Sequence, residues 1–321
     1  MNRQHERAVL QQQIDALVAA WAGGCLHEQR QQLAEQLALV SNQHGRLVGA
    51  AACVQALQAD TRNGPMAFCR LSNRYLAIHE DLAVGSLYLF GQLAQGTGSG
   101  LLFGATLVLQ LKRSGTGWLL DELRIDVPWT RGDRSAASHW QHLPSNSGWQ
   151  PGDPAPAIVS ELHAPWRRVP QAAPSVCLEE AAAELYARYA FAVDQSDIDL
   201  LAGCYSEDIH GGFMPLGALS GRDTVVGMLK QFRQLAPFWQ HFADVLPVRE
   251  EGDGCHAQVI VGRIVPERAQ DASGRALYGA HYQLRIRKVA QGPWHICWSD
   301  YRPGWFTADD IPAFDIGQVT A

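Results

Sequence analysis

Two ionisable side chains occupy positions where the surrounding sequence is apolar. Asp194 lies on the apolar face of a helix expected from ELYARYAFAVD, four residues after Ala190. A carboxylate there is costly to bury unless it is paired. His241 opens an expected strand in QHFADV, and a histidine can act as a general acid or base near neutral pH. The alternatives are a solvated aspartate beside Asp197 and Asp199, and a buried histidine bonded to a backbone carbonyl.

Two later strands carry further polar side chains in alternation. In GAHYQLRIRK, His281 and Gln283 share one face and Tyr282 lies on the other. Alternation alone leaves open which face lines a pocket. In the last strand, Cys297 shares a face with Tyr301, whose hydroxyl could polarise a carbonyl as oxyanion donors do. A polar outer face is the alternative for that strand.

The sequence signals no metal and no organic cofactor. Its seven cysteines are scattered without a Cys-x-x-Cys pair, which fits a reducing cytoplasm better than a zinc site or a disulfide framework. His139 and His142 form an isolated H-x-x-H in a loop-like segment, which is weak evidence for a metal site. The GTGSG motif precedes a strand-like run rather than a helix, so it does not predict a phosphate loop.

Charge and hydropathy argue against nucleic acid and membrane partners. The net charge is −6 and no long basic run occurs, so the footprint of a nucleic-acid-binding surface is missing. The first residues, MNRQHERAVLQQQ, have no apolar core typical of a secretory signal, and we expect a cytoplasmic protein. Residues 82–111 are uncharged, but β-forming residues on both sides of GTGSG predict two strands rather than a membrane span.

A repeated spacing indicates that one domain occurs twice. Trp118 and Trp129 are followed by Trp294 and Trp305 at a constant offset (294 − 118 and 305 − 129 both give 176). Helix-like segments followed by strand-like segments precede each pair. A tandem duplication is the simplest account of this pattern.

The expected domains follow from this repeat. The first covers 5–130, and its residues 5–40 have a helical pattern that extends to LAEQLALV. A segment rich in Pro, Gly and Ser, 131–174, is expected to be a linker. The second domain covers 175–315. Helices followed by strands predict an α+β fold in each domain, with helices packed on one face of an antiparallel sheet.

The second domain resembles a known superfamily. ELYARYAFAVDQSDIDLLAGCYSEDI, the helix after SGRD and the closing W-x-I…GW resemble the SnoaL-like branch of the nuclear transport factor 2-like superfamily. WQHFADV and GWFTADDIPAF resemble scytalone dehydratase-like proteins in particular. The resemblance implies two cone-shaped, curved antiparallel sheets, each wrapped by N-terminal helices and, in the second domain, enclosing a pocket.

The same resemblance implies roles for individual residues. It pairs an aspartate late in the helix, here Asp194, with a histidine on the first long strand, here His241. The pocket asparagine of the family falls on Gln283. The tyrosine expected just before the aspartate is Val193 here, and the later tyrosine falls near Phe213.

A further departure concerns the second histidine of the family, which falls near Arg263 or Val265. Only part of the family's catalytic set is therefore present.

We expect a cofactor-independent lyase or isomerase that is dehydratase-like and moves a proton on a cyclic ketone or polyketide-like substrate. The alternatives are a non-catalytic small-molecule-binding or scaffold protein and a polyketide cyclase. The expected catalytic residues are His241, Asp194 and Tyr301, and the expected contacts to a small apolar cyclic ligand are Gln283, His281, Phe213, Tyr189 and Cys297.

The first domain is expected to be degenerate. On the constant offset, the positions of three polar residues in the last strand (His295, Ser299, Tyr301) are occupied by Leu119, Leu123 and Ile125. The first copy is thus expected to keep the fold without the chemistry and to pair with the second as a pseudo-dimer. A further homodimer is left open.

Overall fold

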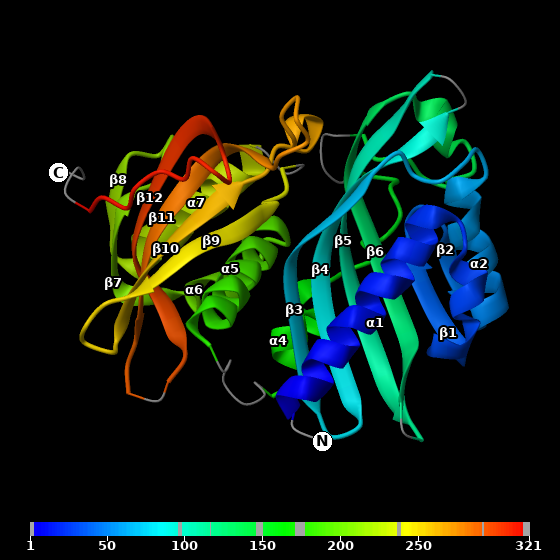
Figure 1. Ribbon diagram of the computed structural model, residues 1–321, viewed down its shortest axis with the longest axis horizontal. Helices are drawn as coiled ribbons and strands as arrows, with labels where there is room; N and C mark the ends of the chain where they lie inside the picture. The colour runs from blue at the N-terminus through cyan, green and yellow to red at the C-terminus, as the bar shows by residue number, and fades with distance from the viewer. Residues whose placement is uncertain are drawn as a thin grey trace. The chain divides into compact units, whose positions relative to one another are not determined.

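The chain folds into two compact units, Met1–Ala172 and Ala173–Ala321, each built around one sheet (Figure 1). The structure is a computed structural model. It describes residues 3–95, 98–115, 117–145, 150–170, 177–235, 239–290 and 292–316.

The first unit begins with a helix that lies across its sheet (Figure 1). Its elements are α1 (Arg3–Gly23), η1 (Leu26–Gln32), β1 (Leu33–Ser41), β2 (Gly45–Val48), α2 (Ala50–Gln58), η2 (Ala59–Thr61), β3 (Cys69–His79), β4 (Leu82–Gln95), β5 (Gly98–Ser114), β6 (Gly117–Gly132), η3 (Arg134–Ala137), α3 (Ser160–His163) and α4 (Pro165–Arg168). Helix α1 buries Leu10, Leu17 and Trp21, a spacing that places all three on one side of the helix.

The second unit repeats this order. Its elements are α5 (Leu178–Asp194), α6 (Ile198–Ala202), β7 (Tyr205–Gly212), β8 (Ala218–Ser220), α7 (Arg222–Leu235), β9 (Ala243–Glu250), β10 (His256–Arg263), η4 (Pro266–Arg268), β11 (Leu277–Lys288) and β12 (Trp294–Thr307). Helix α5 packs against β9 and β12.

Both sheets have the same topology, which confirms the duplication. The strand order is β2-β1-β6-β5-β4-β3 in the first unit and β8-β7-β12-β11-β10-β9 in the second. The repeated tryptophans lie in the last strands, β6 and β12. The α+β class is also confirmed. The sheets are mixed rather than wholly antiparallel, because the last strand returns beside the first and pairs with it in parallel.

The segment LAEQLALV is a strand and not part of a helix, contrary to the prediction for 5–40. In β1, Leu33, Leu37, Leu39 and Ser41 are buried, and the strand pairs with β2 and β6. Its Leu, Ala, Glu and Gln residues favour a helix in isolation, but pairing with β6 overrides that preference. The matching hairpin β7–β8 has no clear sequence signal either.

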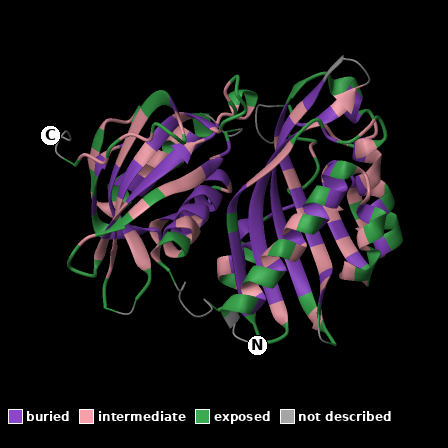
Figure 2. Cartoon of the chain, viewed as in Figure 1, coloured by how far each residue is buried: buried purple, intermediate pink, exposed green. Residues whose placement is uncertain are grey.

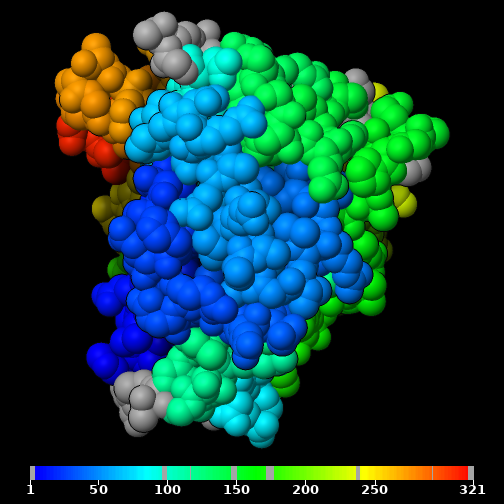
Figure 3. Space-filling view, turned by 90° about the vertical axis from the view of Figure 1, so that its right-hand side faces the viewer, coloured from blue at the N-terminus to red at the C-terminus, as the bar shows by residue number. Residues whose placement is uncertain are grey.

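The segment predicted as a linker, 131–174, belongs largely to the first unit. Trp140 donates its indole N–H to Asp60 at 2.6 Å, and the ring of Trp166 stacks on Tyr75 with centroids 4.3 Å apart. Figure 3 shows residues of this segment, in green, bordering the blue N-terminal residues. Aromatic anchors thus fix a segment whose Pro, Gly and Ser content is typical of loops.

Burial is concentrated in the strands and on the helix faces that meet them (Figure 2). The uncharged stretch 82–111 forms β4 and β5, paired antiparallel as predicted. Of the helices in the described part of the chain, none is long and apolar enough to span a membrane.

Candidate active site

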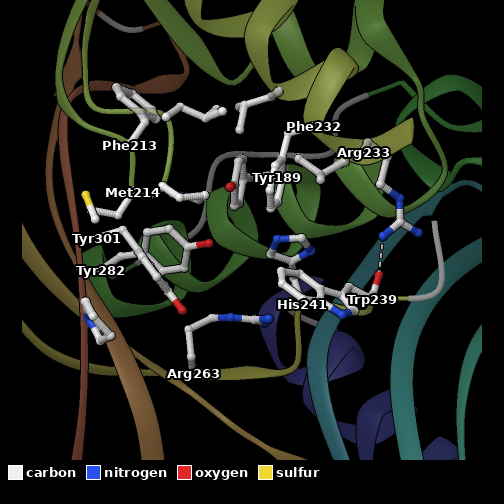
Figure 4. A pocket seen from close by; sticks show the side chains of 15 residues that line it. Tyr189, Phe213, Met214, Phe232, Arg233, Trp239, His241, Arg263, Tyr282 and Tyr301 are labelled. Atoms are coloured by element: carbon white, nitrogen blue, oxygen red, sulfur yellow. Dashed lines mark hydrogen bonds between the residues drawn. The ribbon is translucent and has the colours of Figure 1, made fainter. Parts of the chain in front are cut away.

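A pocket of about 360 Å³ opens in the second unit beside the sheet, α5 and α7 (Figure 4). Its volume lies in the range that holds small organic ligands. Most of the wall is apolar, and the polar atoms come from a histidine, two arginines and three tyrosines. The lining residues are Tyr189, Val193, Phe213, Met214, Pro215, Leu216, Leu229, Phe232, Arg233, Trp239, His241, Arg263, Tyr282, Tyr301 and Pro303.

A histidine–aspartate pair lies at the wall of this pocket. The Nδ1 atom of His241 is 2.6 Å from Oδ1 of Asp194, and the backbone N–H of His241 donates to Oδ2 at 2.8 Å. Asp194 is the last residue of α5, and His241 lies two residues before β9. The end of the helix therefore fixes both the imidazole and the backbone that carries it.

An arginine from α7 stabilises the buried aspartate. Arg233 donates to the backbone carbonyl of Asp194 at 3.0 Å, and its Nη1 lies 3.7 Å from Oδ1. It also donates to the carbonyl of Trp239, which fixes the approach to His241. Burial acts to raise the pKa of the Asp194 carboxyl, but His241 and Arg233 offset this and lower it on balance. Asp194 is thus a carboxylate at neutral pH.

The histidine is neutral at neutral pH. Burial is the main cause that lowers the pKa of His241 below its usual value; Asp194 opposes this, and the cations of Arg263 and Arg233 add to it. A neutral imidazole that donates Nδ1–H to a carboxylate carries its lone pair on Nε2. His241 therefore has the protonation state of a general base.

Three tyrosines surround the histidine on the pocket side. The ring of Tyr189 meets that of His241 edge-on at 6.0 Å, and Tyr282 lies 4.8 Å from Tyr301, its partner across β11 and β12. Burial raises the pKa of both Tyr189 and Tyr282 above 10. These two hydroxyls therefore stay protonated. The hydroxyl of Tyr189 bonds to that of Tyr282, and the hydroxyl of Tyr282 can donate to a ligand oxygen.

A second arginine reaches the pocket from β10. Arg263 donates through Nη1 to the carbonyl of Phe242 at 3.0 Å and through Nη2 to that of Gln240 at 3.2 Å. These carbonyls flank His241 in the chain, so the guanidinium is tied to the segment that carries the histidine. Figure 4 shows Arg263 on the same side of the pocket as His241 and Tyr301.

The structure brings five of the predicted site residues together. His241, Tyr301, Phe213 and Tyr189 line the pocket, and Asp194 supports His241 from behind. The pairing of Asp194 with His241 is the arrangement that the family resemblance implies.

Gln283 and His281 do not line the pocket, which corrects the expectation that they contact a ligand. They lie on the face of β11 opposite to Tyr282. The amide of Gln283 is fully buried, accepts from the backbone N–H of Asp315 at 2.7 Å and donates to the carbonyl of Ala313 at 3.2 Å. This face of the strand is therefore covered by the C-terminal segment.

Cys297 also lies outside the pocket, although it is two strand positions from Ser299 and four from Tyr301. The register of β11 and β12 shifts here, because Trp298 pairs with Arg285 while Ile296 pairs with Ile286. Cys297 is the extra residue of this bulge, and a bulge breaks the alternation of faces. Its thiol donates to the carbonyl of Arg285 at 3.3 Å.

Sequence reasoning did not assign most of the pocket wall to the site, and the residues it missed include Tyr282, Arg263, Phe232 and Trp239. Two of them carry a signal that could have been read. Tyr282 alternates with His281 and Gln283, which were expected to contact a ligand. Trp239 lies two residues before His241, and residues two apart in an extended chain point to the same side. Arg263 lies near the position where the second histidine of the family falls.

A cavity inside the first unit is far smaller, about 30 Å³, and its lining is entirely apolar. Leu120 and Leu123 of β6 contribute to it, together with Trp21 of α1.

Possible metal ligands come together once within the described ranges. Glu251, Asp253 and His256 lie near the turn between β9 and β10. None of the three lines the pocket, and Glu251 already pairs with Arg285 at 2.6 Å.

Comparisons with known proteins find similarities to the second unit. Residues 174–299 match the SnoaL-like domain, whereas no curated protein matches the chain. A hexachlorocyclohexane dehydrochlorinase structure is similar at 14% identity, covering 40% of this chain and 89% of that chain with a TM-score of 0.34.

Two further solved structures have similar values. A ketosteroid isomerase-like protein from Erwinia carotovora has 15% identity and a TM-score of 0.33, and covers 37% of this chain and 94% of its own. An NTF2-like protein from Rhodospirillum rubrum has 21% identity and a TM-score of 0.30, and covers 36% and 94%. Residues 174–299 of the second unit thus match the SnoaL-like domain, and the first unit repeats the strand order of the second.

Proposed function

We propose that the second unit is a cofactor-independent lyase or isomerase that acts on a cyclic ketone or polyketide-like molecule. The observation that carries this proposal is the neutral His241, held by Asp194 at 2.6 Å and set in the wall of a largely apolar pocket. A positioned base of this kind suits removal of a proton from a carbon next to a carbonyl.

The reaction proceeds in two steps. Nε2 of His241 takes the proton from the carbon, and the C–H electron pair moves to the carbonyl oxygen to form an enolate. In the second step the enolate re-forms the carbonyl, and the imidazolium returns its proton. Return to a different carbon gives an isomer, and delivery to a departing hydroxyl gives an alkene and water. Attack of the enolate carbon on a second carbonyl would give a cyclised product from the same residues.

The hydroxyl of Tyr301 is assigned the role of hydrogen-bond donor to the developing oxyanion. Tyr301 lines the pocket beside Tyr282, its cross-strand neighbour, and a donor aimed at the charge that forms in the transition state accelerates such reactions. Asp194 acts through His241, because it fixes the tautomer and stabilises the imidazolium once it forms.

The first unit is proposed to serve as a permanent structural partner of the second, in a cytoplasmic protein. Support comes from its filled, apolar interior and from seven cysteines that are all free thiols. A chain that is monomeric by light scattering would agree with internal pairing, and a homodimer in which the second units pair with each other would contradict it.

The decisive experiment starts from the ligand that the purified protein retains. Mass spectrometry of the extracted ligand identifies its class, and turnover of that class is measured for the wild type and for His241→Ala. We expect a loss of at least about 100-fold, the usual contribution of a general base. Unchanged turnover would refute the mechanism, and binding without turnover in the wild type would favour a binding protein.

The chain offers a matched control for this variant. His256 repeats the local geometry on the surface, since its Nδ1 lies 2.6 Å from Oδ2 of Asp253 and its backbone N–H donates to the same carboxylate. His256→Ala therefore removes an imidazole from an equivalent pair outside the pocket, and turnover should be retained.

A further inference from the structure

Arg263 places a cation in the pocket wall without a carboxylate beside it. Its two hydrogen bonds go to the backbone carbonyls of Phe242 and Gln240. Among the described residues no carboxylate lies within ion-pair distance of its guanidinium. The buried hydroxyl of Tyr186 also interacts with Arg263. A guanidinium has five N–H donors, so at least two remain beyond these three partners.

The other charges of the site are balanced without Arg263. Asp194 is negative and Arg233, 3.7 Å from its Oδ1, is positive, so these two groups offset each other. His241 is neutral at neutral pH because burial lowers its pKa. The pocket therefore carries one uncompensated positive charge, inside a wall that is otherwise largely apolar. A partly desolvated cation of this kind favours an anionic partner.

The aromatic side chains around Arg263 favour a flat ligand. Tyr282, Tyr301, Phe213 and Trp239 all line the same pocket, and aromatic walls pack well against planar rings. Tyr282 also keeps its proton, since burial raises the pKa of its hydroxyl, and it can donate to the same ligand oxygen that a guanidinium would bind.

We infer that the substrate is a planar cyclic molecule bearing an ionised oxygen, a carboxylate or an enolate-type or phenolate-type oxygen, and that this oxygen binds Arg263. The inference rests on the proposed function in one respect, namely that this pocket is the substrate site. It goes beyond that function by naming the charge of the ligand and the residue that selects it.

The test compares two probes that differ in charge and hardly in shape, 2-naphthoate and 2-naphthamide, by calorimetric titration of the full chain at neutral pH and low salt. We expect the carboxylate to bind more tightly by about tenfold or more, as a charge-assisted bond in a partly desolvated site predicts. Because exposed charges are screened by salt and buried ones much less, the preference should persist at physiological ionic strength.

Two variants assign the preference to one residue. Arg263→Gln should bind both probes with similar affinity. Arg285→Gln removes the same charge from the opposite face of the sheet, where Arg285 pairs with Glu251, and should keep the wild-type preference. If Arg263→Gln does not fold, Arg263→Lys retains the cation and should keep part of the preference, while the wild-type comparison needs no variant.

Equal affinity of the wild type for the two probes, or no binding of 2-naphthoate, would overturn the inference. A preference that survives in Arg263→Gln would overturn the assignment to this residue. The variant His241→Gln distinguishes failure of the charge inference from failure of the proposed catalytic function. The charge preference should persist in His241→Gln while turnover is lost, so each result can fail without the other.

Discussion

The carboxylate of Asp194 holds His241 at two points, the ring Nδ1 at 2.6 Å and the backbone N–H at 2.8 Å. The second bond distinguishes this pair from a chance contact, because it fixes the chain just before β9 as well as the imidazole. The side chain of Asp194 is only 2% exposed, whereas that of His241 is 15% exposed. The aspartate therefore acts through the histidine, and the more exposed histidine contacts the ligand.

Asp194→Asn tests this division of roles. An amide that presents its NH₂ group to Nδ1 favours the tautomer with the proton on Nε2, and that tautomer cannot accept a proton from the substrate. We expect turnover to fall by about 100-fold with a smaller change in binding. Histidine nitrogen NMR would report the change of tautomer directly. Asp253→Asn, in the matching surface pair, should leave turnover and binding unchanged. Full activity in Asp194→Asn would contradict the role of the Asp194–His241 pair.

The pH profile follows from the protonation of His241. The base works only when neutral, and burial lowers its pKa from the ordinary 6.5. The rate should therefore be constant across neutral pH and fall only in acid, below 6.5. Because the cation of Arg263 contributes to this lowering, Arg263→Gln should raise the pKa and move the acid limb to higher pH, whereas Arg285→Gln should not. An acid limb above 6.5 in the wild type would show that another group limits the rate.

Tyr301→Phe removes one hydroxyl from the pocket and leaves the ring packed against Tyr282. If the hydroxyl stabilises the oxyanion, kcat should fall by about 10- to 100-fold with an unchanged melting temperature. Tyr278→Phe provides the control, because its hydroxyl donates to Asp244 at 2.8 Å and is not part of the pocket wall. Equal rates for Tyr301→Phe and the wild type would exclude the hydroxyl from the reaction.

The sequence identified the residues whose position depends on local periodicity. Asp194 interrupts an apolar helix face, and the tryptophan spacing aligned the last strands of two similar sheets. Which face of β11 looks inward could not be read in the same way, because alternation is symmetric. That choice depends on the C-terminal segment, which covers Gln283 and leaves Tyr282 to the pocket.

Other sequence-based predictions were wrong because the structure there depends on contacts with distant parts of the chain. The bulge that removes Cys297 from the face of Tyr301 appears only in the register of β12 with β11. The strand β1 has helix-forming residues, and its conformation is set by pairing with β6, far along the chain. The segment after residue 131 has a loop-like composition, and two tryptophans anchor it to the first unit.

Gln283→Leu tests the structural role assigned to that residue. The substitution removes two hydrogen bonds to the C-terminal segment and leaves the N–H of Asp315 and the carbonyl of Ala313 without their present partner. We expect a loss of about 1–2 kcal/mol in the free energy of unfolding, the usual contribution of two partly buried hydrogen bonds. KM should remain unchanged, because the side chain does not line the pocket. A raised KM at unchanged stability would indicate that Gln283 contacts the ligand after all.

A buried carboxylate in the first unit determines the acid stability of that unit. Asp60 accepts from the indoles of Trp140 and Trp21 at 2.6 and 3.0 Å, and lies 2.7 Å from His139 and 3.2 Å from His44. Burial acts to raise its pKa, but the two histidines and Trp140 lower it from 3.8 to about 2. A carboxyl with a depressed pKa stabilises the fold above pH 3.8, and this contribution is lost as the pH falls towards 2.

Asp60→Asn should therefore lower the stability of the first unit by about 2 kcal/mol or more at neutral pH, and should abolish the part of the acid transition between pH 3.8 and 2. Tryptophan fluorescence can follow this unfolding, since two of the indoles bond to Asp60. Asp15→Asn is the control, because Asp15 forms an exposed pair with Arg74 and such pairs contribute little. Equal stability of the Asp60 and Asp15 variants would show that the cluster does not hold the segment after β6 in place.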